Sequence, residues 1–141
     1  MTTENIILSN LIYNDEYRDT VLPHIKDDYF QDRTFHWTFK IVRDYVNKYN
    51  KSPTKDILLT DLNIRHDIGE TECRDTAAFI KEHLKENPQP LPWLLDSTEK
   101  WCQDKAMFNA VYASIDILEK KNDGSKRTSI PTLLRDALNV S

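Results

Sequence analysis

Apolar residues recur every three or four positions along almost the whole chain, and this spacing is the period of amphipathic α-helices. The first such run, residues 6–12, predicts a short buried helix. Its apolar face consists of Ile7, Leu8, Leu11 and Ile12. Asn14 can cap a second helix over residues 15–22, because its side chain can accept a hydrogen bond from the free N–H of Glu16 or Tyr17.

A longer stripe over residues 32–49 predicts the central core helix. Its members are Phe35, Phe39, Val42, Val46 and Tyr49. Asn50 and Lys51 end this helix. Ser52 and Pro53 then predict a new start, because serine caps free N–H groups and proline loses nothing at the first helical position.

Two further helices complete the first part of the chain. The helix after Pro53 has an apolar face made of Ile57, Leu58, Leu59 and Leu62. Residues 63–69 are polar and predict a loop. The next helix ends near Asn87, and its face holds Cys73, Ala77, Ile80 and Leu84.

The segment 87–92, NPQPLP, has three prolines in five residues and predicts a break without helix. Beyond it, residues 92–121 contain neither glycine nor proline after Pro92, and predict one helix of roughly 45 Å at 1.5 Å per residue. A loop over 122–129 and a helix opened by Pro131 follow. We therefore expect an all-α fold, with a compact multi-helix head, 1–90, followed by a long α-helical hairpin arm, 91–141.

Glycine is scarce, which limits the chemistry that this chain can perform. The two glycines are Gly69 and Gly124, whereas tight hairpins and phosphate-binding loops need glycine at strained or closely approached positions. No G-x-x-x-x-G-K-[ST] sequence occurs, so the chain has no P-loop for ATP phosphates. The composition therefore disfavours both sheets and nucleotide binding.

The charge and the cysteines narrow the class of protein further. The net charge of −4 and a pI of about 5.5 argue against binding nucleic acid through bulk charge. Cys73 and Cys102 have no neighbouring thiol at metal-ligand spacing and are expected to be reduced. No signal peptide or membrane-spanning run is present. We expect a soluble intracellular protein without membrane contact.

Catalytic, cofactor-binding and metal-binding residues are not predicted. The four histidines, His24, His36, His66 and His83, never occur at the spacing of a zinc site. Adjacent acids such as Asp27 and Asp28 point in different directions on a helix, which is unsuited to paired acid–base work. A G-x-S-x-G nucleophile motif is also missing.

The long arm helix supplies the candidate protein interface. Its apolar residues exceed what two helices can bury against each other, so the arm is expected to dock on the head or on another subunit. The predicted interface residues are Trp101, Phe108, Val111, Tyr112, Ile115 and Leu118.

Two weaker candidates concern nucleic acid. A basic group at the hairpin turn could contact DNA or an acidic partner, or could be solvated; it consists of Lys120, Lys121, Lys126 and Arg127. Aromatic residues between Tyr29 and Tyr49 could stack bases, but their helical spacing favours core packing.

Four segments resemble, in order and across essentially the whole chain, the N-terminal domain of T-even-type phage replicative DNA helicases of the DnaB family. They are ENIILSNLIYNDEY, TFKIVRDYVNKYNKSPT, TEKWCQDKAMFNA and IPTLLRDALNVS. His36 in a central helix also fits that family. Lys105 departs from it, because the wider family often has arginine there, and lysine cannot supply a planar bidentate group.

This resemblance implies a non-catalytic domain that forms the collar of a hexamer, pairs hairpins between subunits and helps recruit primase and other replisome proteins. It implies that ATP and magnesium bind to a C-terminal domain of an ATP-dependent helicase. It also implies that this chain binds DNA only indirectly or weakly. The expected location is the cytoplasm of the infected bacterial cell. The resemblance would place Ser141 inside the second arm helix, which would then be truncated, or just after that helix. The alternative is a stand-alone helical DNA-binding or protein-interaction regulator, with the helix after Ser52 as its recognition element.

Overall fold

The computed structural model describes the backbone of residues 2–120 and 124–140, and the side chains of the same residues except 124–126. Every regular element in this described part is helical, which confirms the all-α prediction. The chain divides into two compact units, Met1–Leu95 and Asp96–Ser141, and the division lies inside the long helix.

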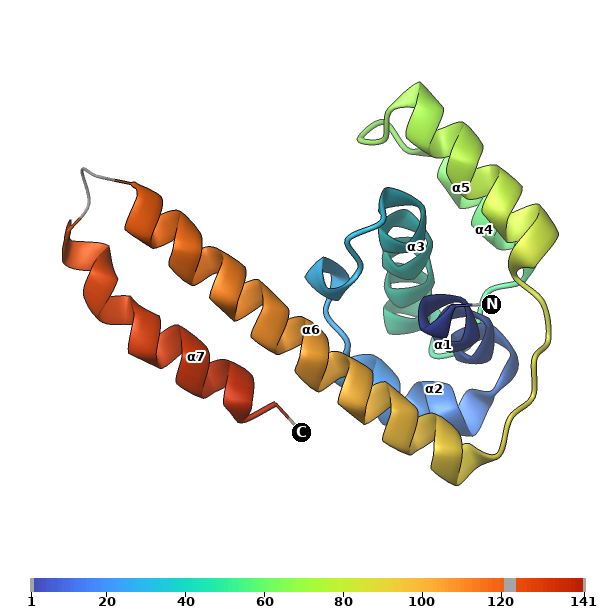
Figure 1. The fold of residues 1–141 in the computed structure, drawn as a ribbon. Coiled ribbons are helices and arrows are strands. Elements are labelled where there is room, and N and C mark those ends of the chain that lie inside the picture. The colour runs from blue at the N-terminus through green and yellow to red at the C-terminus, as the bar shows by residue number, and fades with distance from the viewer. Residues whose placement is uncertain (1, 121–123, 141) are drawn as a thin grey trace. The chain divides into compact units, whose positions relative to one another are not determined.

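The elements follow one another as in Figure 1. The first unit contains α1 (Thr3–Tyr13), α2 (Asp15–Val21), the 3-10 turns η1 (Leu22–His24) and η2 (Asp27–Tyr29), α3 (Arg33–Tyr49), α4 (Lys55–Ile64) and α5 (Glu70–His83). The long helix α6 (Leu91–Glu119), the 3-10 turn η3 (Gly124–Ser129) and α7 (Ile130–Leu138) follow.

Side-chain caps explain why α1 and α2 are separate helices. The Thr2 hydroxyl accepts a bond from the Asn5 N–H at 3.2 Å, at the start of α1. Asn14 ends α1, and its side-chain oxygen accepts from the Tyr17 N–H at 3.0 Å, so one residue closes the first helix and opens the second. The predicted Asn14 cap is confirmed.

Replacing Asn14 with alanine is expected to lower the free energy of unfolding by about 1 kcal/mol, because the Tyr17 N–H loses its partner at the start of α2. Urea denaturation followed by circular dichroism measures this loss. Thr20→Ala, an exposed change later in the same helix, serves as the control and should alter stability by less than about 0.5 kcal/mol. An equal loss in both variants would contradict a capping role.

The end of α3 and the start of α4 differ in how well the sequence predicted them. Asn50 ends α3 as predicted, in the left-handed conformation with φ 58° and ψ 28°, which asparagine tolerates better than most residues. The predicted start at Ser52 and Pro53 is wrong. Helix α4 begins at Lys55, and the Thr54 hydroxyl caps it by accepting from the Ile57 N–H at 3.2 Å.

Instead of capping a helix, the Ser52 hydroxyl binds the buried Arg18 of α2. The Arg18 Nη1 donates to the Ser52 hydroxyl at 2.6 Å, and that hydroxyl donates to the Leu11 carbonyl at 3.0 Å. The same guanidinium binds the carboxylates of Asp15 and Asp19 at 2.8 and 2.9 Å. Arg18 therefore ties α1 and α2 to the turn between α3 and α4.

The core of the first unit lies between α1, α2, α3, α4 and α5. Its fully buried side chains include Leu8, Leu11, Tyr17, Phe39, Val42, Leu58, Leu62, Ile80 and Leu84. Tyr49, the last member of the predicted α3 stripe, is instead 51% exposed.

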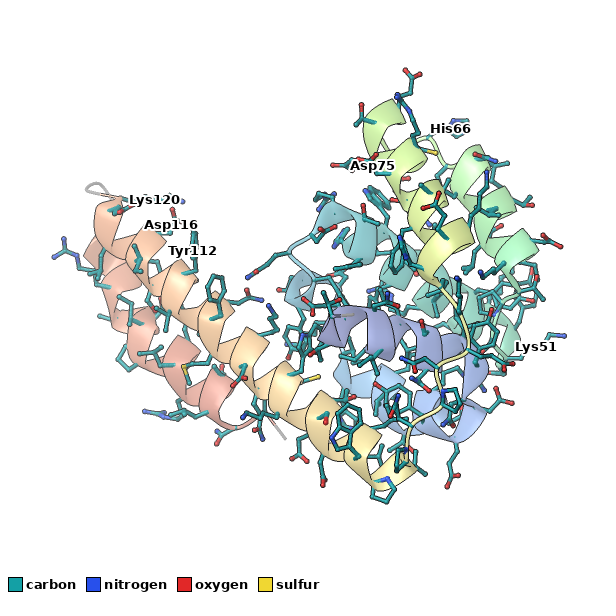
Figure 2. All side chains as sticks on the ribbon, turned by 45° about the vertical axis from the view of Figure 1, so that its right-hand side comes forward. Lys51, His66, Asp75, Tyr112, Asp116 and Lys120 are labelled. Carbon is teal, nitrogen blue, oxygen red and sulfur yellow. The ribbon has the colours of Figure 1, made fainter. Side chains whose placement is uncertain are left out.

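The long helix begins at Leu91, so the prediction that 87–92 holds no helix is wrong for its last two residues. Pro92 lies in the first turn of α6, where the missing N–H would have had no partner. Helix α7 runs back beside the second half of α6 in both views, as a hairpin should (Figure 1 and Figure 2). No helix in the described ranges is both long and apolar enough to cross a membrane.

Candidate functional site

Helix α6 presents a row of large apolar side chains to solvent, which we call the outer face of α6. It consists of Phe108, Val111, Tyr112, Ile115 and Leu118, which are 49%, 43%, 67%, 48% and 54% exposed. The steps of three and four residues place all five on one side of the helix. Scattered exposed apolar residues are ordinary, but a contiguous row along one helix face is typical of an interaction surface.

The opposite side of α6 is buried and lined with small residues. Ala106, Ala110 and Ser114 are four residues apart and each is at most 9% exposed. The Ser114 hydroxyl donates to the Ala110 carbonyl at 2.7 Å, so its polar group is satisfied within the helix. Ile115 lies about two and a half helical turns after Ala106, and therefore on the opposite side.

The outer face has a stacked aromatic pair at its start and an ion pair beside its end. The rings of Phe108 and Tyr112 stack with their centroids 5.7 Å apart. Tyr112, Asp116 and Lys120 follow at intervals of one turn towards the end of the helix (Figure 2). The Lys120 Nζ binds the Asp116 carboxylate at 2.8 Å. An apolar centre with a polar border is the usual anatomy of a protein–protein interface.

Trp101 does not share the exposure of the other five predicted interface residues. It lies seven residues before Phe108, on the same side of α6, but is only 7% exposed, and the neighbouring Cys102 is 4% exposed. Burial raises the pKa of the Cys102 thiol to about 11, which leaves it without the thiolate that a nucleophile needs. The exposed surface therefore begins at Phe108.

The predicted basic group at the hairpin turn lies only partly within the described residues. Lys120 and Arg127 are exposed, and Lys120 is paired with Asp116. Lys121 and the side chain of Lys126 lie outside the described part of the chain. The DNA-contact role of this group stays a prediction.

The aromatic residues of the first unit mostly pack in its core. Tyr29, Phe30, Trp37 and Phe39 are at most 4% exposed, and Phe30 contacts Phe39 with centroids 5.0 Å apart. The Trp37 indole N–H donates to Glu72 at 2.6 Å, and this bond holds the pKa of the Glu72 carboxyl below its usual range. Buried rings of this kind offer no stacking surface for bases.

The described residues do not group into a metal centre. No cluster of three or more histidine, cysteine, aspartate or glutamate side chains suited to a metal ion occurs among them. The helix considered for DNA recognition, α4, carries Lys55 against Asp56 and Asp61, which gives it no excess of positive charge. The outer face of α6 is therefore the strongest candidate site.

Sequence reasoning found the outer face but missed the small buried residues opposite it. Alanine and serine contribute little to an apolar pattern, so Ala106, Ala110 and Ser114 gave a weak signal. Their four-residue spacing was the available clue. The site depends on them, because their burial leaves the large residues on the side that faces solvent.

Comparison with known proteins extends the sequence resemblance. No family model matches the chain. The chain is 33% identical over 144 residues to the DnaB-like replicative helicase of Enterobacteria phage T4. This match covers 96% of the present chain and 30% of the helicase, so the chain spans under a third of that relative's length.

Proposed function

We propose, from the premise that this chain is homologous to the N-terminal part of a phage DnaB-like replicative helicase, that it is a non-catalytic assembly domain of such a helicase. The observation that carries the proposal is the outer face of α6. It offers five large apolar side chains for contact, and the catalytic signatures considered above are missing from the sequence. The function that we propose for the outer face of α6 is therefore to bind another protein.

A second copy of the chain is the occupant that fits the outer face best. Phe108, Val111, Ile115 and Leu118 are separated by three, four and three residues, which is the a and d spacing of a helix that packs along another helix. The same face on two copies can pair about a twofold axis, and twofold pairs are the commonest closed assemblies. The opposite side of α6 is already buried, so pairing needs no refolding.

The role that we propose for the domain within the whole protein is based on the helicase that the chain resembles. In this proposal, pairs formed through α6 join into the collar of a hexameric ring, and the collar helps to recruit primase and other replisome proteins. ATP and magnesium bind to the remainder of the helicase polypeptide, where the P-loop is expected. The complete protein would work in the cytoplasm of the infected bacterial cell.

Replacing Ile115 with aspartate is expected to raise the dissociation constant of self-association about 10- to 100-fold. The change removes apolar area from the outer face and requires a carboxylate to be desolvated in each copy. Sedimentation equilibrium over a concentration series measures the constant for both proteins. Stability should change little, because Ile115 is 48% exposed in the single chain.

The matched control makes the same substitution elsewhere. Ile64 on α4 is 64% exposed, so Ile64→Asp adds the same charge without touching the outer face. It should associate as the unchanged protein does. A chain that stays monomeric at all concentrations, or an equal effect of the two substitutions, would refute self-association through α6.

A further inference from the structure

Four apolar residues of the outer face of α6 are spaced symmetrically about Ala113. Val111 and Ile115 lie two residues before and after it. Phe108 and Leu118 lie five residues before and after it. The row therefore has the same spacing in both directions along the helix. If two copies of α6 run in opposite directions and meet at this point, each of these side chains faces an apolar side chain of the other copy.

One long edge of this row is more exposed than the other. It consists of Lys105, Tyr112 and Glu119, of which the last two are exposed and the first is half-buried. The other edge holds Met107, which is half-buried, and Ser114, which is buried. The members of each edge are seven residues apart, close to two helical turns, so each set stays on its own side of the helix. A second copy can therefore contact the first edge more readily than the other.

The more exposed edge meets its own copy only if the two helices are antiparallel. A twofold axis perpendicular to the helices brings the same edges together, whereas a parallel pair places each edge beside the opposite edge of the other copy. In a parallel pair, Glu119 would lie beside Ser114 of the other copy, which is already buried in its own chain. The exposure of the side chains of α6 therefore favours the antiparallel direction.

The charges on the more exposed edge also match in the antiparallel direction. Lys105 and Glu119 lie seven residues before and after Tyr112, so Lys105 of each copy comes beside Glu119 of the other. Neither of these two charged side chains forms an ion pair or a hydrogen bond with any other described residue. Charged residues that flank the apolar row of paired helices set the orientation of the pair. An antiparallel pair gains this lysine–glutamate contact twice.

A parallel pair would bring like charges together. Asp104 is exposed and lies one helical turn before Phe108, on the same side of α6. In a parallel pair in register, the two Asp104 carboxylates would face each other, which is unfavourable. In the antiparallel pair they lie about 27 Å apart along the helix axis, because each is nine residues from Ala113 and a helix rises 1.5 Å per residue.

We propose that α6 pairs with α6 of a second copy in the antiparallel direction, about a twofold axis at Ala113. The apolar row supplies the contact area, and the contacts between Lys105 of each copy and Glu119 of the other select the direction. The Tyr112 side chains of the two copies lie beside each other near the axis. This inference rests on the self-association through α6 proposed above, and adds to it the orientation of the pair and the two residues that determine it.

Charge reversal at either position should weaken the association. Lys105→Glu and Glu119→Lys each replace two attractive contacts by two repulsive ones, and each should raise the dissociation constant about 3- to 10-fold, because exposed ion pairs are individually weak. Sedimentation equilibrium over a concentration series measures the constants. Glu119→Lys makes the net charge of −4 less negative, so a weaker association of this variant cannot result from overall repulsion.

A control variant carries the same charge change outside α6. Lys51 is exposed in the first unit, between α3 and α4 (Figure 2). Lys51→Glu gives the chain the same net charge as Lys105→Glu. It should change the dissociation constant less than about 2-fold, because salt screens exposed charges that are far apart.

An equimolar mixture of Lys105→Glu and Glu119→Lys should regain the association that each variant loses alone. In a mixed antiparallel pair, one copy carries only glutamate at the two positions and the other only lysine, so both contacts again join opposite charges. The mixture should associate within about 2-fold of the unchanged protein, and so should the double variant by itself. Recovery in the mixture also shows that both variants are folded.

The possible results separate the orientation of the pair from its existence. If the unchanged protein associates but neither charge reversal weakens it, or the mixture does not recover, the antiparallel orientation is overturned and pairing through α6 is retained. An unchanged protein that stays monomeric at all concentrations overturns the proposed self-association, and this inference with it. Weakening by both reversals with recovery in the mixture supports the antiparallel pair.

Discussion

Phe39→Ala is expected to lower the free energy of unfolding of the first unit by about 3–5 kcal/mol, which is the usual cost of truncating a buried phenylalanine. Phe39 is fully buried at the centre of α3. Its ring contacts Phe30 with centroids 5.0 Å apart, and the Arg43 guanidinium lies 5.7 Å from its centre. Truncation removes these contacts and leaves a cavity, because the groups around a deleted side chain relax only partially.

Urea denaturation followed by circular dichroism measures this effect. Tyr49→Ala is the matched control, because it truncates an aromatic residue of the same helix that is 51% exposed. The control should cost less than about 1 kcal/mol. A loss below about 1.5 kcal/mol for Phe39→Ala would mean that α3 does not pack as the structure describes.

Arg18→Ala is expected to cost about 2–3 kcal/mol. Removing one member of a buried ionic network typically costs 3–5 kcal/mol, but Asp15 and Asp19 are 81% and 68% exposed and can be hydrated after the change. The remaining loss comes from the Ser52 hydroxyl, which loses its donor, and from the volume of the deleted side chain.

A double-mutant cycle tests the link between Arg18 and Ser52. Ser52→Ala alone should cost about 1–2 kcal/mol, because its hydroxyl bridges Arg18 and the Leu11 carbonyl. The double variant should be more stable than the sum of the single losses predicts, by at least about 0.5 kcal/mol. Strict additivity would show that the 2.6 Å contact between Arg18 and Ser52 contributes nothing.

The number and type of helices followed from local signals that the sequence holds. The apolar period of α3 and the cap at Asn14 act over one helical turn, so they could be identified without any tertiary contact. The resemblance carried by four segments led to the same kind of helicase that the 33% identity supports. The local signals therefore indicate the helical fold, and the shared sequence indicates the similarity to that helicase.

The start of α4 shows where local reasoning fails. Ser52 and Thr54 are both good capping residues, and Pro53 favours a helix start at either side of it. The choice depends on Arg18, which lies far away along the chain but adjacent in space and occupies the Ser52 hydroxyl. No signal near Ser52 could reveal that partner.

The sequence by itself determined that the protein is all-helical and that α6 has more apolar residues than a solvated helix would carry. Only the tertiary structure decided which of them are exposed. Trp101 and Phe108 are seven residues apart on one side of α6, yet they are 7% and 49% exposed. Periodicity fixes the direction of a side chain around its own helix, whereas exposure depends on what other parts of the chain cover.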